Sequence, residues 1–207
     1  VSGGELALTG FDFSGRRFTD ASTGFALHDG ILAVSKLAAR GPLGTLRGDG
    51  SVRLFFKDLS SRPADPAITL HAAIEQLTLE AWNKQVPMSG LLDGQIDLAG
   101  TLHKPTGSLS AKVPQLVLSD SRFRDVTVAV DLTQELINMR SLSAVLGSGL
   151  LSGTALLRRE GDRPMNVVVA PSKLPLRELP GISRLPFELD GTLSGEVHIL
   201  GSTQPLH

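Results

Sequence analysis

Apolar and polar residues alternate along most of the chain. From Val126 to Leu132, aliphatic side chains occupy every second position, and threonine, alanine and aspartate fill the positions between them. Other segments with the same alternation are 5–9, 75–80, 95–98 and 196–199. A period of two predicts β-strands that have one apolar face and one polar face.

The predicted strands recur about every ten to twelve residues and are separated by turn signals. These turn signals are found at 29–30, 48–50 and 160–164. The long helical segments that a parallel crossover would require are missing between the strands. Only 77–85 and 174–182 have a weak helical pattern. We therefore expect an all-β fold of antiparallel strands with little helix.

The chain also repeats itself about every hundred residues. Three sets of residues recur in the same order: Gly90, Gly94 and Gly100 as Gly191, Gly195 and Gly201; Phe18 and Asp20 as Phe123 and Asp125; Leu77 and Leu79 as Leu174 and Leu176. The offsets are 101 (191 − 90), 105 (123 − 18) and 97 (174 − 77) residues. Insertions in turns produce such a drift, because loops tolerate changes of length.

The repeat predicts how the chain is organised. We expect one repeat unit over 1–88, a second over 89–188, and the start of a third over 189–207. Together they would form one continuous module of a longer protein. The Pro-rich segment 60–66 is too short to link domains, so we interpret it as a loop between strands.

The amino-acid composition excludes several classes of function. Hydrophobic residues make up 41% of the chain and charged residues 20%, which indicates a folded core. The net charge of −1 gives no electrostatic basis for a nucleic-acid partner, and we expect none. The absence of cysteine excludes disulfides and suits an oxidising compartment. No apolar run approaches the ~18 residues that a membrane-spanning helix needs.

The residues that could carry chemistry form no recognisable site. The five histidines lack the spacing of a zinc site. The carboxylates Asp93 and Asp97 become Ser194 and His198 in the next repeat, which argues against calcium. The glycine-rich run 147–153 lacks the lysine of a phosphate-binding loop. We expect no catalytic residues, no metal, no cofactor and no enzymatic activity.

Many strands with one apolar face, and no helices to cover them, leave two arrangements open. Two sheets could bury their apolar faces against each other in a sandwich. Alternatively, one curved sheet could keep an open apolar trough. Composition does not separate the two.

The repeat motif resembles that of a known family. The pattern Gly191-x-Leu193-Ser194-Gly195-x-Val197-x-Ile199-x-Gly201, preceded by 185–187, resembles the repeat of the TamB family and of the wider AsmA-like group of Gram-negative envelope proteins. The earlier copy over 90–111, the strand pattern over 123–132 and the glycine turn over 149–153 extend this resemblance.

The resemblance implies a structure and a function. It implies a curled, elongated, U-shaped (β-taco-like) sheet with an apolar interior. The chain would lie in the periplasm, within an envelope protein whose inner-membrane anchor lies outside this segment. Its hydrophobic groove would carry phospholipid acyl chains between the inner and outer membranes and support outer-membrane biogenesis. The full-length protein would work with an outer-membrane barrel partner of the TamA type.

The alternating aliphatic positions then become candidates for the lining of the lipid groove. These residues are Leu6, Leu8, Val52, Leu54, Phe56, Leu77, Leu79, Ile96, Leu98, Val126, Val128, Val130, Leu132, Val197 and Ile199. The main alternative function is a chaperone-like or protein-binding β-sandwich that assists the assembly or secretion of outer-membrane proteins. A carbohydrate-active β-solenoid would need aromatic and acidic platforms, and aromatic residues make up only 4% of the chain.

Overall fold

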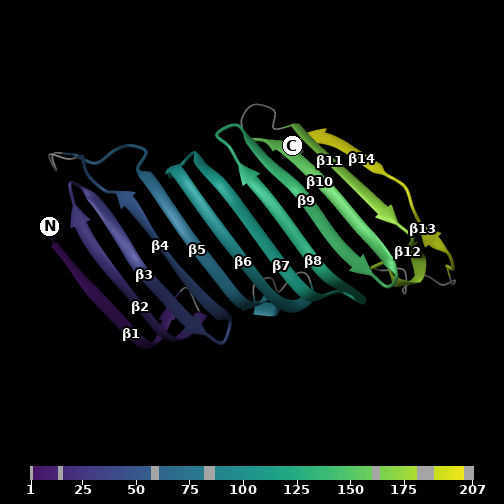
Figure 1. The fold of residues 1–207 in the computed structure, drawn as a ribbon, viewed down its shortest axis with the longest axis horizontal. Coiled ribbons are helices and arrows are strands. Elements are labelled where there is room, and N and C mark those ends of the chain that lie inside the picture. Colours follow the sequence, from purple (N-terminus) through teal and green to yellow (C-terminus); the bar gives the residue numbers. More distant parts are fainter. Residues whose placement is uncertain are drawn as a thin grey trace, which may run out of the picture. The chain divides into compact units, whose positions relative to one another are not determined.

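The computed structural model describes residues 2–13, 16–56, 61–81, 87–159, 164–180 and 189–202. Twelve of its strands form a single antiparallel sheet, hydrogen-bonded in the order β1-β2-β3-β4-β5-β6-β7-β8-β9-β10-β11-β14 (Figure 1). Strand neighbours in the sheet are therefore also neighbours in the chain, except where β14 follows β11. The prediction of an all-β, antiparallel fold with little helix is confirmed.

The strands of the large sheet are β1 (Ser2–Phe13), β2 (Arg16–His28), β3 (Ile31–Gly41), β4 (Gly44–Arg53), β5 (Ala67–Thr78), β6 (Met88–Thr101), β7 (Pro105–Leu118), β8 (Ser121–Leu132), β9 (Leu136–Leu146), β10 (Gly149–Arg158), β11 (Pro164–Ser172) and β14 (Val197–Ser202). A separate two-stranded sheet pairs β12 (Leu174–Pro175) with β13 (Thr192–Leu193).

Two short 3-10 turns interrupt the strands. They are η1 (Leu79–Ala81) and η2 (Leu176–Glu178), and each lies within a segment whose sequence has a weak helical pattern. Residues 82–85 and 181–182, which also belong to those predicted segments, lie outside the described residues. Residues 61–66, which precede β5, have no regular structure, which agrees with the loop predicted over 60–66; residue 60 itself lies outside the described residues.

The glycines of 48–50 do not form the predicted turn, because both lie inside β4. Their role is to let β5 come close: a Cβ at Gly48 would lie 2.3 Å from the carbonyl oxygen of His71, and a Cβ at Gly50 would lie 2.5 Å from that of Thr69. The predicted turn at Asp29 and Gly30 is confirmed, with φ of 49° and 75°.

The elements themselves recur with the offsets of the sequence repeat. β3 and β9 begin at 31 and 136, and β4 and β10 begin at 44 and 149, so both pairs lie 105 residues apart. η1 and η2 begin at 79 and 176, which is 97 residues apart. The order of elements from β1 to β6 is thus repeated from β7 to β14.

The chain divides into two compact units. The N-terminal unit comprises Val1–Leu77 and Asp93–Leu109, and the C-terminal unit comprises Thr78–Leu92 and Ser110–His207. The boundaries predicted from the sequence repeat, at 88/89 and 188/189, remain a prediction.

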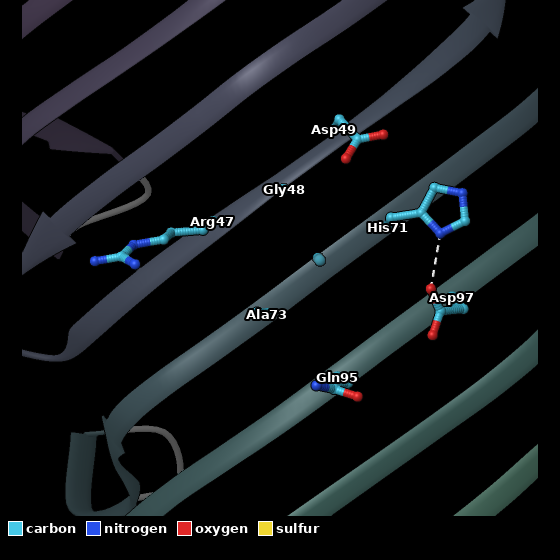
Figure 2. Close-up of a pocket in the computed structure, with 8 residues that line it drawn as sticks. Arg47, Gly48, Asp49, His71, Ala73, Gln95 and Asp97 are labelled. Atoms are coloured by element: carbon cyan, nitrogen blue, oxygen red, sulfur yellow. Dashed lines mark hydrogen bonds and ion pairs between the residues drawn. The ribbon is translucent and has the colours of Figure 1, made fainter.

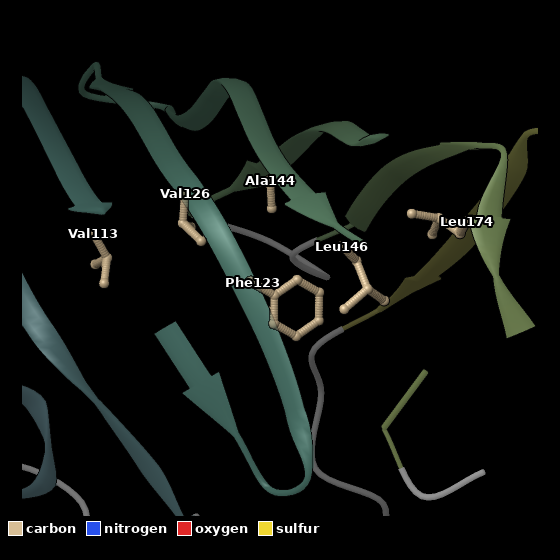
Figure 3. Packing of buried hydrophobic residues seen from close by; sticks show 6 residues of the cluster. All are labelled: Val113, Phe123, Val126, Ala144, Leu146 and Leu174. Carbon is tan, nitrogen blue, oxygen red and sulfur yellow. The ribbon is translucent and has the colours of Figure 1, made fainter. Parts of the chain in front are cut away.

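The buried core lies in the C-terminal unit. Leu146 on β9 is fully buried and Leu174 on β12 is 2% exposed. Around them pack Phe123, Val126 and Ala144, with Val113 completing the cluster (Figure 3). The hydroxyl of Ser121 donates a 2.6 Å hydrogen bond to the carbonyl of Glu178 and so ties η2 to the start of β8. The segment 174–180 therefore covers part of one sheet face.

The N-terminal unit is organised differently. Among the residues of this unit whose solvent exposure the structure describes, no hydrophobic side chain is buried. Its described residues also supply no second layer that faces the sheet. In this unit the sandwich alternative is not realised over the part of the chain that the structure describes.

Candidate functional site

The strand register gathers the apolar residues of the N-terminal unit on one face. Directly paired residues of neighbouring strands share a face, because side chains alternate along each strand. Leu27 pairs with Leu32, Leu32 with Val52, and Val52 with Ile68. This row of four aliphatic side chains runs across β2, β3, β4 and β5.

Two further rows run parallel to the first. One consists of Phe25, Val34, Gly50 and Leu70, and the other of Leu8, Ala21, Ala39, Leu46 and Ile74. We call the face that carries these three rows the N-terminal apolar face. Several of its large side chains are open to solvent: Leu6 is 48% exposed, Leu8 41% and Phe25 42%.

Only some of the predicted lining residues of the N-terminal unit lie on its apolar face. Leu6, Leu8 and Val52 lie on the N-terminal apolar face. Ile96 and Leu98 flank Asp97, whose side chain bonds His71 on the opposite face, so alternation directs both aliphatic residues to the apolar side. Leu77 follows Gln76, whose φ is 53°, near the end of β5.

Two predicted residues lie off the sheet. β4 ends at Arg53, and Leu54 and Phe56 belong to the irregular segment that follows it. The backbone N–H groups of Leu54 and Phe55 donate to the carbonyl of Gly30, which folds this segment against the turn between β2 and β3.

The C-terminal unit shows the same arrangement of cross-strand rows. Val128 pairs with Leu142, Leu142 with Gly153, Gly153 with Val169, and Val169 with Val197. The adjacent rows are Val130, Met139, Ala155, Val167 and Ile199, and Leu132, Ile137, Leu157, Met165 and Gly201. We call this the C-terminal apolar face. It brings together five of the predicted lining residues: Val128, Val130, Leu132, Val197 and Ile199.

The solvent exposure of the side chains increases along the C-terminal apolar face, from Val126 toward the edge strand β14. Val126 is 8% exposed and belongs to the buried core, whereas Val128 and Val130 are half-buried. Ile199, on the edge strand, is 47% exposed. Leu79 lies in η1, where it packs against the core cluster. The end of the face near Val126 is thus covered, and the remainder is open.

Sequence reasoning missed more than half of the apolar residues on the two faces. The missed residues include Phe25, Leu27, Leu32, Val34, Leu46, Ile68, Leu70, Ile74, Met139, Leu142, Val167 and Val169. The alternation of Ile68, Leu70, Ala72 and Ile74 was a readable signal. In β3 a bulge at Lys36 (φ 53°) shifts the alternation by one residue and hides it.

The opposite face of the N-terminal unit is polar. Arg47 and Asp49 on β4, His71 on β5, and Gln95 and Asp97 on β6 line an open depression of about 350 Å³ (Figure 2). His71 Nδ1 lies 2.7 Å from Asp97 Oδ1. This hydrogen bond raises the pKa of His71, and the negative charges of Asp49 and Asp97 act in the same direction. All these groups are solvated, as expected of the wet side of a sheet.

A second histidine–carboxylate contact lies between the loops that precede β5 and β7. Asp65 Oδ1 accepts hydrogen bonds from the backbone N–H of His103 at 3.0 Å and lies 2.8 Å from its Nδ1. Hydrogen bonds from Thr101 and His103 lower the pKa of Asp65 to about 2. The carboxylate therefore stays charged and ties the two loops together.

The described residues contain no group of three or more histidine, cysteine or acidic side chains that could hold a metal ion. Among the helical elements that the structure describes, none has the length and hydropathy to cross a membrane. The two apolar faces are accordingly the candidate functional site.

Comparison of the chain with models of protein families, with curated proteins and with solved structures finds no match.

Proposed function

We propose that the apolar faces shelter the acyl chains of phospholipids. The chain would be a periplasmic segment of a protein that bridges the inner and outer membranes and carries phospholipid between them, in support of outer-membrane biogenesis. The observation that carries the proposal is the N-terminal apolar face, whose aliphatic rows cross four strands while its described residues include no buried hydrophobic side chain.

The energetics favour hydrocarbon as the occupant. Each methylene group that leaves water for an apolar surface gains about 0.8 kcal/mol. The rows consist mainly of leucine, isoleucine, valine and alanine. The row that contains Leu27, Leu32, Val52 and Ile68 is entirely aliphatic. A surface of this kind binds hydrocarbon without selecting one shape, which suits a carrier of many lipids.

Curvature of the sheet around the lipid is part of the proposal. Register shifts occur in β3 between Val34 and Leu37 and in β8 between Arg124 and Thr127. Bulges bend a strand and increase its local twist. They support a curved sheet; that it curls toward its apolar side is what the resemblance to the TamB and AsmA-like repeat implies. The barrel partner of the TamA type is likewise proposed from that resemblance.

A binding experiment with matched variants tests the proposal. Leu70 lies on the N-terminal apolar face, and its neighbour Thr69 lies on the polar face opposite Ser51. We expect Leu70→Arg to abolish binding of a fluorescent phospholipid, because the new charge interrupts the central row. Thr69→Arg should bind as the unmodified chain does.

The outcomes separate the alternatives. Equal lipid binding by folded Leu70→Arg and Thr69→Arg would contradict the apolar face as the site. If the unmodified chain binds no lipid but retains unfolded outer-membrane protein through the same face, the chaperone-like function replaces the proposal.

A further inference from the structure

The buried core of the C-terminal unit lies on the same sheet face as its open rows. Leu146, Ala144 and Leu142 occupy alternate positions of β9, so their side chains share one face. Leu142 belongs to the C-terminal apolar face, whereas Ala144 is 3% exposed and Leu146 is fully buried. The core is therefore the continuation of the apolar face beneath a cover.

The cover is the segment 174–180, which follows β11 in the chain. It places leucine side chains on the core. Leu174 is 2% exposed and points toward Leu146, and Leu179 packs against the same cluster (Figure 3). Aliphatic side chains of the chain itself thus occupy a surface of the kind that the proposed function assigns to acyl chains.

The hydrogen bonds that hold the cover are short in extent. β12 pairs with β13 over two residues, whereas β10 and β11 in the sheet pair over eight. Leu176 N–H donates to the carbonyl of Gly191 at 3.0 Å, and the Ser121 hydroxyl donates to the carbonyl of Glu178 at 2.6 Å. Local opening requires least free energy where such contacts are few, so the segment can open while the sheet stays paired.

The cover leaves the sheet at a strained residue. Lys173 lies between β11 and β12 and has a φ of 51°. Residues other than glycine seldom adopt this left-handed conformation, because their Cβ atom comes too close to the backbone. Opening of the cover lets Lys173 return to an ordinary conformation, so the strain favours the open state. This residue is placed as a hinge.

We propose that the segment 174–180 is a displaceable cover, whose place on the core is taken by the acyl chains of phospholipid. The inference rests on the proposed function, because it concerns the regulation of the same apolar surface. The hydrophobic effect scales with buried apolar area and has no direction, so hydrocarbon replaces leucine side chains without a specific fit. The cover shields this part of the face from water until lipid arrives.

Thiol labelling reports the position of the cover, because the chain contains no cysteine. Leu174→Cys places a single thiol on the cover, and Ala144→Cys places one on the sheet beneath it. Leu150→Cys places one on the opposite face of β10, where Leu150 is 44% exposed. Without lipid, the first two variants should react slowly with a maleimide and the third rapidly.

Vesicles of phosphatidylethanolamine and phosphatidylglycerol supply the lipid. As they are added to saturation, the labelling rate of Leu174→Cys should rise at least about tenfold, because lipid that binds the open state increases its population. Ala144→Cys should stay slow, since acyl chains replace the cover above it, and Leu150→Cys should not change. Fast labelling of both Leu174→Cys and Ala144→Cys would overturn the proposal, because lipid would then unfold the core.

Hydrogen exchange of the chain gives a second measurement that needs no cysteine. The amides of 174–180 should exchange faster when lipid is bound, and those of β9 should not. Lys173→Gly relieves the strain at the hinge and should slow exchange of 174–180 several-fold without lipid. Lys36→Gly is the matched control, since Lys36 has a φ of 53° in β3, and it should leave that exchange unchanged. Equal exchange of 174–180 in the two variants would contradict the hinge.

The outcomes separate this inference from the proposed function. Native mass spectrometry shows whether lipid is bound in each sample. If lipid is bound while the labelling of Leu174→Cys and the exchange of 174–180 stay unchanged, the cover is a fixed part of the core, and this inference alone fails. If no lipid binds to the unmodified chain, the proposed function fails together with it.

Discussion

Val126 and Val128 lie two residues apart on β8 and point to the same face of the sheet, yet only Val126 is buried. Val126 packs within the core cluster of Phe123, Ala144 and Leu146. Val128 pairs with Leu142 on the open part of the face. The limit between covered and open surface in the C-terminal unit therefore falls between two adjacent rows.

This limit predicts opposite outcomes for one type of substitution. Val126→Arg buries an unpaired charge and should lower the free energy of unfolding by about 3 to 5 kcal/mol. Val128→Arg can extend its guanidinium into water, so it should fold with a loss of about 1 kcal/mol or less. Urea unfolding followed by circular dichroism measures both. Equal destabilisation by the two substitutions would mean that the face around Val128 is covered.

A second prediction concerns the cover itself. Ser121 is 2% exposed, and its hydroxyl is the donor to the carbonyl of Glu178. Ser121→Ala leaves that carbonyl without the hydroxyl and should cost about 1 to 3 kcal/mol of stability. Ser148→Ala, in the exposed turn between β9 and β10, serves as the control and should change stability little. Ser121→Ala with unchanged stability would show that this hydrogen bond does not hold the cover.

The close approach of β12 to β10 can be tested at a glycine. A Cβ at Gly149 would lie 2.5 Å from the carbonyl oxygen of Lys173 and 2.6 Å from Cα of Leu174. Gly149→Ala should therefore displace the covering segment and destabilise the fold by about 1 to 3 kcal/mol. At Gly201 the nearest atom would be Met165 Cε at 3.8 Å, so Gly201→Ala should be neutral. Thermal unfolding compares the two, and similar midpoints would contradict the packing described.

The polar face of the N-terminal unit predicts a pH effect. The hydrogen bond to Asp97 raises the pKa of His71 above its ordinary value of 6.5. A pKa that is higher in the folded state stabilises the fold below the unfolded pKa, and this contribution disappears as pH rises through the folded pKa. An NMR titration of His71 should show a lower pKa in Asp97→Asn than in the unmodified chain. An unchanged pKa would mean that the contact does not persist in solution.

Much of the fold follows from the alternation of side chains. The segment from Val126 to Leu132 predicted a strand with four aliphatic residues on one face, and β8 has this form. The repeat offsets likewise anticipated that β3 and β9, and β4 and β10, occupy matching places. Both signals are local or periodic, so a single sequence carries them.

Other features depend on contacts between distant residues. Lys36 and Gln76 both have a φ of 53°, a conformation that lysine and glutamine do not favour, so the type of residue at these positions does not predict it. The sequence predicts a turn at the glycines of β4 because their actual partner, the backbone of β5, lies about twenty residues further along the chain. The burial of Val126 depends on Leu174 and Ser121, which its own strand pattern does not reveal.

Native mass spectrometry of the chain, after incubation with phospholipid vesicles and separation from them, tests the central claim most directly. The account predicts that the unmodified chain and Thr69→Arg carry phospholipid-mass adducts, and that folded Leu70→Arg carries none. Adduct-free spectra of the unmodified chain, or adducts retained equally by Leu70→Arg, would contradict it.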